Sequence, residues 1–147
     1  MPIGLGARET LRMEMKYVLY GPDINPTTTP IEAGLRRITK FDKGEFIGRE
    51  SLIHENVNQK KRLICFEMME RAVPRQNYDI FSNGEKIGMV TSGTQSPSLN
   101  KGIGLGYVEI EYAKPGTKID IDIRGHKKSA TIMKPPLYNQ GTVNLYP

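Results

Sequence analysis

Apolar and polar residues alternate strictly along 118–124, which reads Lys-Ile-Asp-Ile-Asp-Ile-Arg. A period of two predicts a β-strand with one buried face, because successive side chains of a strand point to opposite faces. Gly125 marks a turn after this segment, and 127–133 is predicted to return as the second strand of a hairpin. A second hairpin is predicted around Asn83-Gly84, a pair that supplies the positive φ angles of a tight turn.

Six short strands are predicted in all after residue 58. Turn residues separate them at regular intervals, as is typical of a small closed barrel or a sandwich. The predicted strands are 62–69, 78–81, 86–91, 103–109, 118–124 and 127–133. The change of pattern near 56–60 predicts a boundary, with one unit over 1–57 and a second over 58–147.

The N-terminal part shows a helical pattern instead. Strong helix formers run through 7–15, and apolar residues spaced four apart share one face. These residues are Ile3, Ala7, Leu11 and Met15. The pattern predicts a short amphipathic helix that packs through this face. Arg8 and Arg12 fall on a neighbouring stripe, one turn apart, facing either solvent or a cleft that requires positive charge.

The segment between this helix and the first predicted strand has mixed character. Residues 20–30 contain three prolines and a glycine, which predict a loop. Residues 31–41 are predicted to form a helical turn and a strand, and 46–56 a second short helix.

Composition narrows the possible chemistry. The 147 residues include one cysteine and two histidines, which exclude a zinc site of four Cys/His ligands and a disulfide framework. The net charge of +5 is mild, and its cations are scattered as on a solvated surface. No apolar run is long enough to span a membrane, and the N-terminus lacks the features of a signal peptide. We therefore expect a cytoplasmic protein that does not bind a membrane.

Binding of nucleic acid is not expected. An RNA-binding barrel displays aromatic side chains beside cations on one sheet face. The seven tyrosines and four phenylalanines form no such cluster in the sequence.

Several short motifs have structural interpretations. The glycines of 102–106 follow the pattern GxGxG without a helix after them, which favours close backbone approach within a barrel strand over a phosphate loop. Thr91-Ser92-Gly93 is interpreted as a hairpin end, and Cys65 in its apolar run as a small core residue. Asp120 and Asp122 share a strand face that we expect to be solvated. Arg75 is a different case, because an arginine in a proline-restrained loop can hold a planar anion by a bidentate contact.

Five motifs in order along the chain resemble the glycine cleavage system T protein family of tetrahydrofolate-dependent aminomethyltransferases. The first is GLGARETLRME at 4–14, which is similar to GxGARDxLRLE. The others are LYG at 19–21, TTPIEAGL at 28–35, DKGEFIGRE at 42–50, and VTSGTQSPSL at 90–99 with GYV at 106–108. The resemblance covers essentially the whole chain.

The resemblance implies a mainly β fold, in which a six-stranded antiparallel barrel (58–147) follows a short α/β segment from the folate-binding region (1–57). It implies transfer of the methylene of an aminomethyl group, carried by the lipoylated H protein, to tetrahydrofolate with release of ammonia. The catalytic carboxylate of the family lies in an N-terminal part that is missing here. The chain then corresponds to a fragment, inactive alone, that carries neither a catalytic residue nor a metal ligand and has that N-terminal part as a partner.

The resemblance also points to folate-binding residues. The arginine of the GAR motif falls on Arg8, and the arginine of the barrel loop on Arg75. The C-terminal end of the family approaches the ligand. Here the sequence after Pro136 is Leu-Tyr-Asn-Gln where many relatives have Phe-Val-Arg, so the contact would come from Tyr138 or Asn139.

One alternative is a non-enzymatic folate-binding relative used in iron–sulfur protein maturation. The signature of that branch near this place is KGCYxGQE. Here Glu45 stands where that branch has cysteine and Arg49 where it has glutamine, which favours the T protein.

Overall fold

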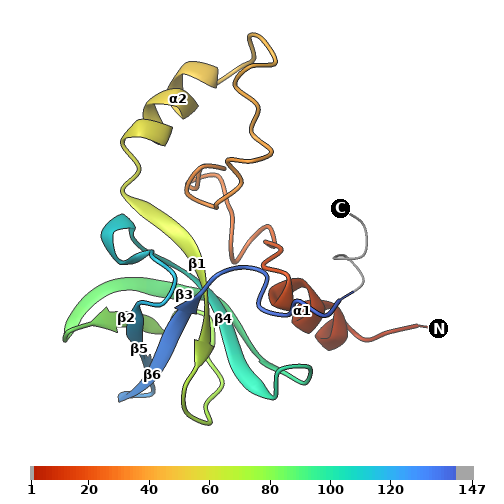
Figure 1. Cartoon of the computed structure of the whole chain (residues 1–147), viewed down its shortest axis with the longest axis vertical. Helices are drawn as coiled ribbons and strands as arrows, with labels where there is room; N and C mark the ends of the chain where they lie inside the picture. Colours follow the sequence, from red (N-terminus) through yellow and green to blue (C-terminus); the bar gives the residue numbers. More distant parts are fainter. Residues whose placement is uncertain (1, 142–147) are drawn as a thin grey trace.

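The computed structural model describes residues 2–141, which form a β-barrel with a helix against its outer surface and a second helix standing away from it (Figure 1). The helices are α1 (Leu5–Glu14) and α2 (Arg49–Val57). The strands are β1 (Lys61–Met68), β2 (Asp79–Ser82), β3 (Glu85–Ser96), β4 (Lys101–Glu109), β5 (Lys118–Ile123) and β6 (His126–Met133), with a 3-10 turn at Ile110–Tyr112. The mainly β class is thereby confirmed.

The six strands close into an antiparallel barrel in the order β1-β4-β3-β2-β5-β6. Of the two architectures that the strand spacing predicted, the barrel is the one formed. Both predicted hairpins are present, and their turns use the left-handed backbone conformation. Asn83 and Gly84 have φ angles of 50° and 88°, and Arg124 and Gly125 have 55° and 85°.

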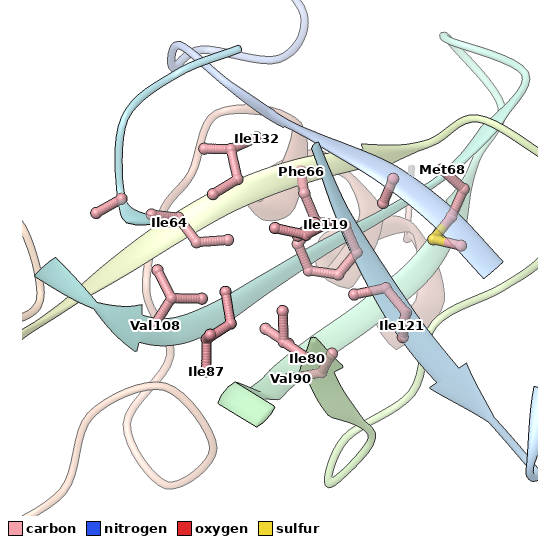
Figure 2. Packing of buried hydrophobic residues seen from close by; sticks show 12 residues of the cluster. Ile64, Phe66, Met68, Ile80, Ile87, Val90, Val108, Ile119, Ile121 and Ile132 are labelled. Carbon is pink, nitrogen blue, oxygen red and sulfur yellow. The ribbon is translucent and has the colours of Figure 1, made fainter. Parts of the chain in front are cut away.

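The barrel interior is filled by aliphatic side chains around Phe66 (Figure 2). Room for this ring depends on a glycine of the facing strand. A Cβ added at Gly104 would lie 2.3 Å from Cζ of Phe66, and one at Gly102 would lie 2.0 Å from the carbonyl oxygen of Ala72. The prediction that the glycines of 102–106 permit close approach is therefore confirmed. Cys65 is buried as predicted, and burial raises the pKa of its thiol to about 11.

Helix α1 packs on the outside of β3 and β4. Met13 is fully buried in a second apolar cluster with Leu63, Leu105 and Leu137. The predicted buried face was wrong: Ile3 is 68% and Leu11 is 56% exposed. The helix instead buries its last three residues, Arg12, Met13 and Glu14. The two charged side chains can be buried because they find partners on the barrel and the loop.

Residues 15–48 run mostly through successive turns, so the strand predicted within 31–41 was also wrong. A reciprocal pair of bonds closes one of these turns. The backbone N–H of Thr29 donates to the Glu32 carboxylate at 3.0 Å, and the N–H of Glu32 donates to the Thr29 hydroxyl at 3.1 Å. This capping arrangement stabilises the turn, and the Glu32 carbonyl accepts the N–H of Leu63 in β1 at 2.8 Å.

Two further sequence predictions concern β3 and α2. Thr91-Ser92-Gly93 lies inside β3, at a shift of register against β4, and not at a hairpin end. The second helix is confirmed with a later start than predicted, and all of its described residues remain at least partly exposed. Neither described helix has the length and apolar character needed to cross a membrane.

Candidate functional site

A cavity of about 430 Å³ opens between α1, the turn after β3 and the C-terminal segment. Two of the three predicted folate-binding residues line it, Arg8 from the helix and Tyr138 from the C-terminal segment. The other lining residues are Ile3, Leu11, Arg12, Glu14, Met15, Tyr17, Ser98 and Gly141. The folding of α1 against the barrel therefore brings together residues 130 positions apart in the sequence.

The cavity combines one exposed cation with a largely apolar wall. The guanidinium of Arg8 forms no ion pair with any residue in 2–141, and its side chain is exposed. Leu11, Met15, Tyr17 and Tyr138 line the same cavity. A guanidinium binds carboxylates or polarised carbonyl groups through paired N–H donors, and aromatic rings accept a flat apolar body. The arrangement suits a planar ligand that carries an anionic or carbonyl group.

Arg75 lies elsewhere. It is exposed in the loop between β1 and β2 and is not among the described residues that line this cavity. The preceding residue, Pro74, packs so closely on β3 that a Cβ added at Gly93 would lie 2.3 Å from its carbonyl oxygen. The structure thus brings Arg8 and Tyr138 together without Arg75, whose role in a ligand site stays a prediction. Asn139 follows Tyr138 in the C-terminal segment, and its ligand contact likewise stays a prediction.

A larger hollow of about 770 Å³ lies where the β1–β2 loop meets the turn between β3 and β4. Its wall includes Arg71 and Lys101, but Lys101 is already paired with Glu67 at 2.9 Å. None of the predicted ligand residues is found among its described lining residues. The smaller cavity is therefore the better candidate, because an unpaired guanidinium and aromatic rings converge there.

A buried ion pair lies directly behind the cavity. Nη1 of Arg12 donates to Oδ2 of Asp23 at 2.7 Å, and Nη2 donates to the Ser92 hydroxyl at 2.9 Å and also pairs with Glu9. The hydroxyls of Ser92 and Thr91 donate to Oδ1 of Asp23 at 2.7 and 2.6 Å. This network joins the helix, the proline-rich loop and β3.

Tyr107 closes the other side of this network. Its hydroxyl donates to the backbone carbonyl of Asp23 at 2.9 Å. Burial raises the pKa of Tyr107 to about 12, so the hydroxyl keeps its proton and remains a donor over the physiological range.

Glu14 connects the helix to two other walls of the cavity. Its carboxylate accepts a hydrogen bond of 2.5 Å from the Ser96 hydroxyl at the end of β3. Its backbone carbonyl accepts the N–H groups of Leu137 and Tyr138 at 2.8 and 3.1 Å.

The sequence patterns placed Arg12 beside Arg8 but did not predict that Arg12 is buried. They gave no indication that Asp23, Glu14 and Ser96 support the site. The sequence held one signal of these partners. Arg12 and Glu14 flank Met13, and charged side chains beside a buried residue need polar partners when they are buried with it. Within the described ranges, no group of three or more Asp, Glu, His or Cys residues gathers as metal ligands would.

Comparisons with known proteins agree with the motifs. The family model described as "Glycine cleavage T-protein C-terminal barrel domain" matches residues 61–139, more than half of the chain, and the "GCVT N-terminal domain" model matches residues 1–43. The chain is 53% identical over 138 residues to the protein named "Aminomethyltransferase" from Bacteroides thetaiotaomicron, covering 92% of this chain and 38% of that protein. It is 44% identical to the "Probable aminomethyltransferase" of Pyrococcus furiosus, covering 99% of this chain and 39% of that protein.

A solved structure shows the same fold. The crystal structure of glycine cleavage system aminomethyltransferase T from Bartonella henselae superposes with a TM-score of 0.87 at 31% identity, over 94% of this chain and 40% of that one. The chain thus spans about two fifths of the length of the relatives it matches. On the family-model match and these similarities, the chain belongs to the glycine cleavage T-protein family.

Proposed function

We propose that this chain supplies part of the folate site of an aminomethyltransferase. The complete enzyme would transfer the methylene of the aminomethyl group carried on lipoylated H protein to tetrahydrofolate, releasing ammonia. Relatives at 44–53% identity carry the name aminomethyltransferase, which supports this class of reaction. Tetrahydrofolate enters as a substrate and no metal is required.

The observation that carries the proposal is the meeting of Arg8 and Tyr138 in one cavity. Tetrahydrofolate has a flat pterin ring with a polarised carbonyl group at one end and glutamyl carboxylates at the other. Arg8 would bind one of these acceptors through its N–H groups, and Tyr138 would contact the flat body of the ligand. Arg75 is proposed to line the route that the ligand follows beyond this cavity.

The proposed units of the chain, 1–57 and 58–147, would both contribute to the site. Arg8 and Leu11 come from the first unit, and Ser98 and Tyr138 from the second. The cavity would therefore depend on the way in which α1 packs on the barrel.

The remaining part of the enzyme is proposed to cover the exposed apolar side chains of the first unit. Leu5 is 82% exposed, Ile38 is 72% exposed, and Ile47 is fully exposed. The folded partner of these side chains would be the rest of the N-terminal domain, whose family model matches residues 1–43.

Catalysis would also depend on that remaining part. Release of ammonia and attack by folate need proton transfer, for which carboxylates and histidines are the usual groups. The cavity offers Arg8 as a binding group, while Glu14 is already committed to Ser96. We therefore expect no catalytic residue in this chain and no turnover by the chain alone.

The non-enzymatic alternative finds less support. Glu45 and Arg49, which occupy the positions where the iron–sulfur maturation branch has cysteine and glutamine, form an ion pair of 3.5 Å across one turn. Arg49 also donates from Nε to the carbonyl oxygen of Phe41 at 3.0 Å. These two residues are therefore engaged in local structure in the segment that leads into α2.

The test is reconstitution. The chain is joined to the N-terminal part of the Bacteroides thetaiotaomicron relative and supplied with aminomethyl-loaded H protein and tetrahydrofolate. We expect formation of methylenetetrahydrofolate and ammonia by the joined protein, and only background formation by the chain alone. An inactive joined protein that is folded, assayed beside an active complete relative, would contradict the proposed function.

A further inference from the structure

We propose that Glu14 is a positioning residue, which sets where Tyr138 and Ser98 stand in the cavity. The importance of this role for a ligand rests on the proposed function, whereas the placement of the two side chains can be tested without any ligand.

The C-terminal end of α1 is completed by a segment from the other end of the chain. The last carbonyl groups of a helix have no partner within the helix and must find one elsewhere. The carbonyl oxygens of Arg12 and Met13 accept the N–H groups of Tyr17 and Lys16, which closes a local turn. The carbonyl of Glu14 accepts instead from Leu137 and Tyr138, so the C-terminal segment completes the helix end.

Leu137 anchors this segment to the barrel. Leu137 is 8% exposed and packs with Met13 in the second apolar cluster, next to the bond that its N–H donates. Figure 1 shows the segment after β6 running past α1. The residue that follows Leu137 is therefore held at the helix end, and its ring lies on the cavity wall.

The Glu14 side chain is buried against the end of β3. It is 2% exposed, and its partner Ser96 is completely buried. The Ser96 hydroxyl donates to the carboxylate and accepts the N–H of Leu99 at 3.0 Å, which closes the turn that carries Ser98. One residue thus ties α1 to the β3–β4 turn through its side chain and to the C-terminal segment through its backbone.

Through these contacts Glu14 holds three walls of the cavity, namely the end of α1, the β3–β4 turn and the C-terminal segment. A hydrogen bond to a charged group is short and directional, and a buried carboxylate that loses its donor must move or be hydrated. Loss of the Ser96 bond would free Glu14 and the end of α1, and with them the carbonyl that holds Tyr138.

The test uses the absence of tryptophan from the sequence. In the 147-residue chain, Tyr138→Trp introduces the only tryptophan at the cavity wall, and tryptophan is excited at longer wavelength than the remaining tyrosines. Its emission wavelength and its quenching by acrylamide are measured alone and in combination with Ser96→Ala, Glu14→Ala and Glu14→Gln. The matched control is Ser129→Ala, which removes a hydroxyl bonded at 3.0 Å to Asp120 on the exposed face of β6.

We expect Ser96→Ala and Glu14→Ala to shift the emission to longer wavelength and to increase quenching, with far-UV circular dichroism unchanged. Glu14→Gln should restore the parent spectrum, because its amide oxygen still accepts from Ser96. Ser129→Ala should have no effect. The proposal is overturned if folded Ser96→Ala leaves the fluorescence unchanged, or if Ser129→Ala shifts it equally. Ser96→Ala alone decides the outcome if Glu14→Ala does not fold.

A second measurement separates this proposal from the proposed function. Binding of 5-formyltetrahydrofolate to the joined protein should weaken about tenfold with Ser96→Ala, the equivalent of losing one charge-assisted hydrogen bond. If the unsubstituted joined protein does not bind this folate, the proposed function fails while the fluorescence result still stands. If it binds and Ser96→Ala shifts the fluorescence without changing affinity, Glu14 positions Tyr138 without serving the ligand and the proposal is wrong in that respect.

Discussion

Asp23 lies fully buried against Arg12, with a carboxylate oxygen 2.7 Å from Nη1 of the guanidinium. Each oxygen of this carboxylate accepts at least two hydrogen bonds, including those from Ser92 and the N–H of Leu19. Such saturation offsets much of the cost of removing the carboxylate from water, whereas the buried Nε of Arg12 has no hydrogen-bond partner among the described residues. The pair joins α1 to a loop that otherwise lacks regular structure, and it lies behind the cavity wall that carries Arg8.

Substitution of Asp23 should therefore be costly. We expect Asp23→Asn to lower the free energy of unfolding by about 3–5 kcal/mol, because it removes the buried counter-ion of Arg12 and leaves only the partly exposed Glu9. Urea unfolding followed by circular dichroism measures the change. The exposed Asp42 provides the matched control, and Asp42→Asn should change stability by no more than about 0.5 kcal/mol. A loss below about 1 kcal/mol for Asp23→Asn would show that the pair contributes no more than a surface ion pair.

The same pair shows why the sequence predicted the barrel better than the site. The strands repeat every two residues, so 118–124 and the turn at Gly125 reveal their structure locally. Arg12 lies 80 positions from Ser92, and Glu14 lies 82 positions from Ser96. No local period encodes such partners.

The prediction of the buried face of α1 was wrong for a related reason. Hydrophobicity alone selected Leu11, whereas the stripe that carries Arg12 and Glu14 is buried because its charges are satisfied by distant groups. The family motif, in contrast, identified Arg8 directly. Its meeting with Tyr138 needed the fold, because the two residues come from opposite ends of the chain.

Gly104 gives a prediction for the core. We expect Gly104→Ala to destabilise the chain by about 1–3 kcal/mol, because the new methyl group would overlap the Phe66 ring. Gly6→Ala is the control, since a Cβ there meets nothing within 4 Å and alanine favours the helix by up to about 1 kcal/mol. A double-mutant cycle with Phe66→Leu checks the cause. Additive losses from the two substitutions would mean that the ring is not the obstacle.

The Cys65 thiol should react slowly in the folded chain. Its ionisation should lower the free energy of unfolding at alkaline pH. Burial raises its pKa from 9.0 to about 11, so the folded state holds the proton more tightly than the unfolded state. The resulting stabilisation is complete below about pH 9 and is lost as the pH rises through 11. We expect slow reaction with a disulfide reagent at pH 8 and rapid reaction in urea.

Urea unfolding at pH 7.5 and pH 10 measures the linkage of Cys65. The decline in stability between these values should be smaller in Cys65→Ala than in the parent chain. The residual decline would include the contribution of Tyr107, whose pKa is raised to about 12. A rapid reaction of the native chain at pH 8 would contradict the buried position of the thiol.

The last prediction decides between the cavity that Arg8 lines and the larger hollow that Arg71 lines. In the joined protein we expect Arg8→Ala to weaken binding of 5-formyltetrahydrofolate by about 1.5–3 kcal/mol, the range for a hydrogen bond to a charged group. Titration calorimetry at fixed salt measures the affinity. Arg71→Ala is the matched control, because it removes an exposed arginine from the larger hollow. Full affinity of Arg8→Ala together with weakened binding by Arg71→Ala would move the folate site to that hollow. A loss in Arg75→Ala as well as in Arg8→Ala would extend the site to the β1–β2 loop, since both cations would then contact one ligand.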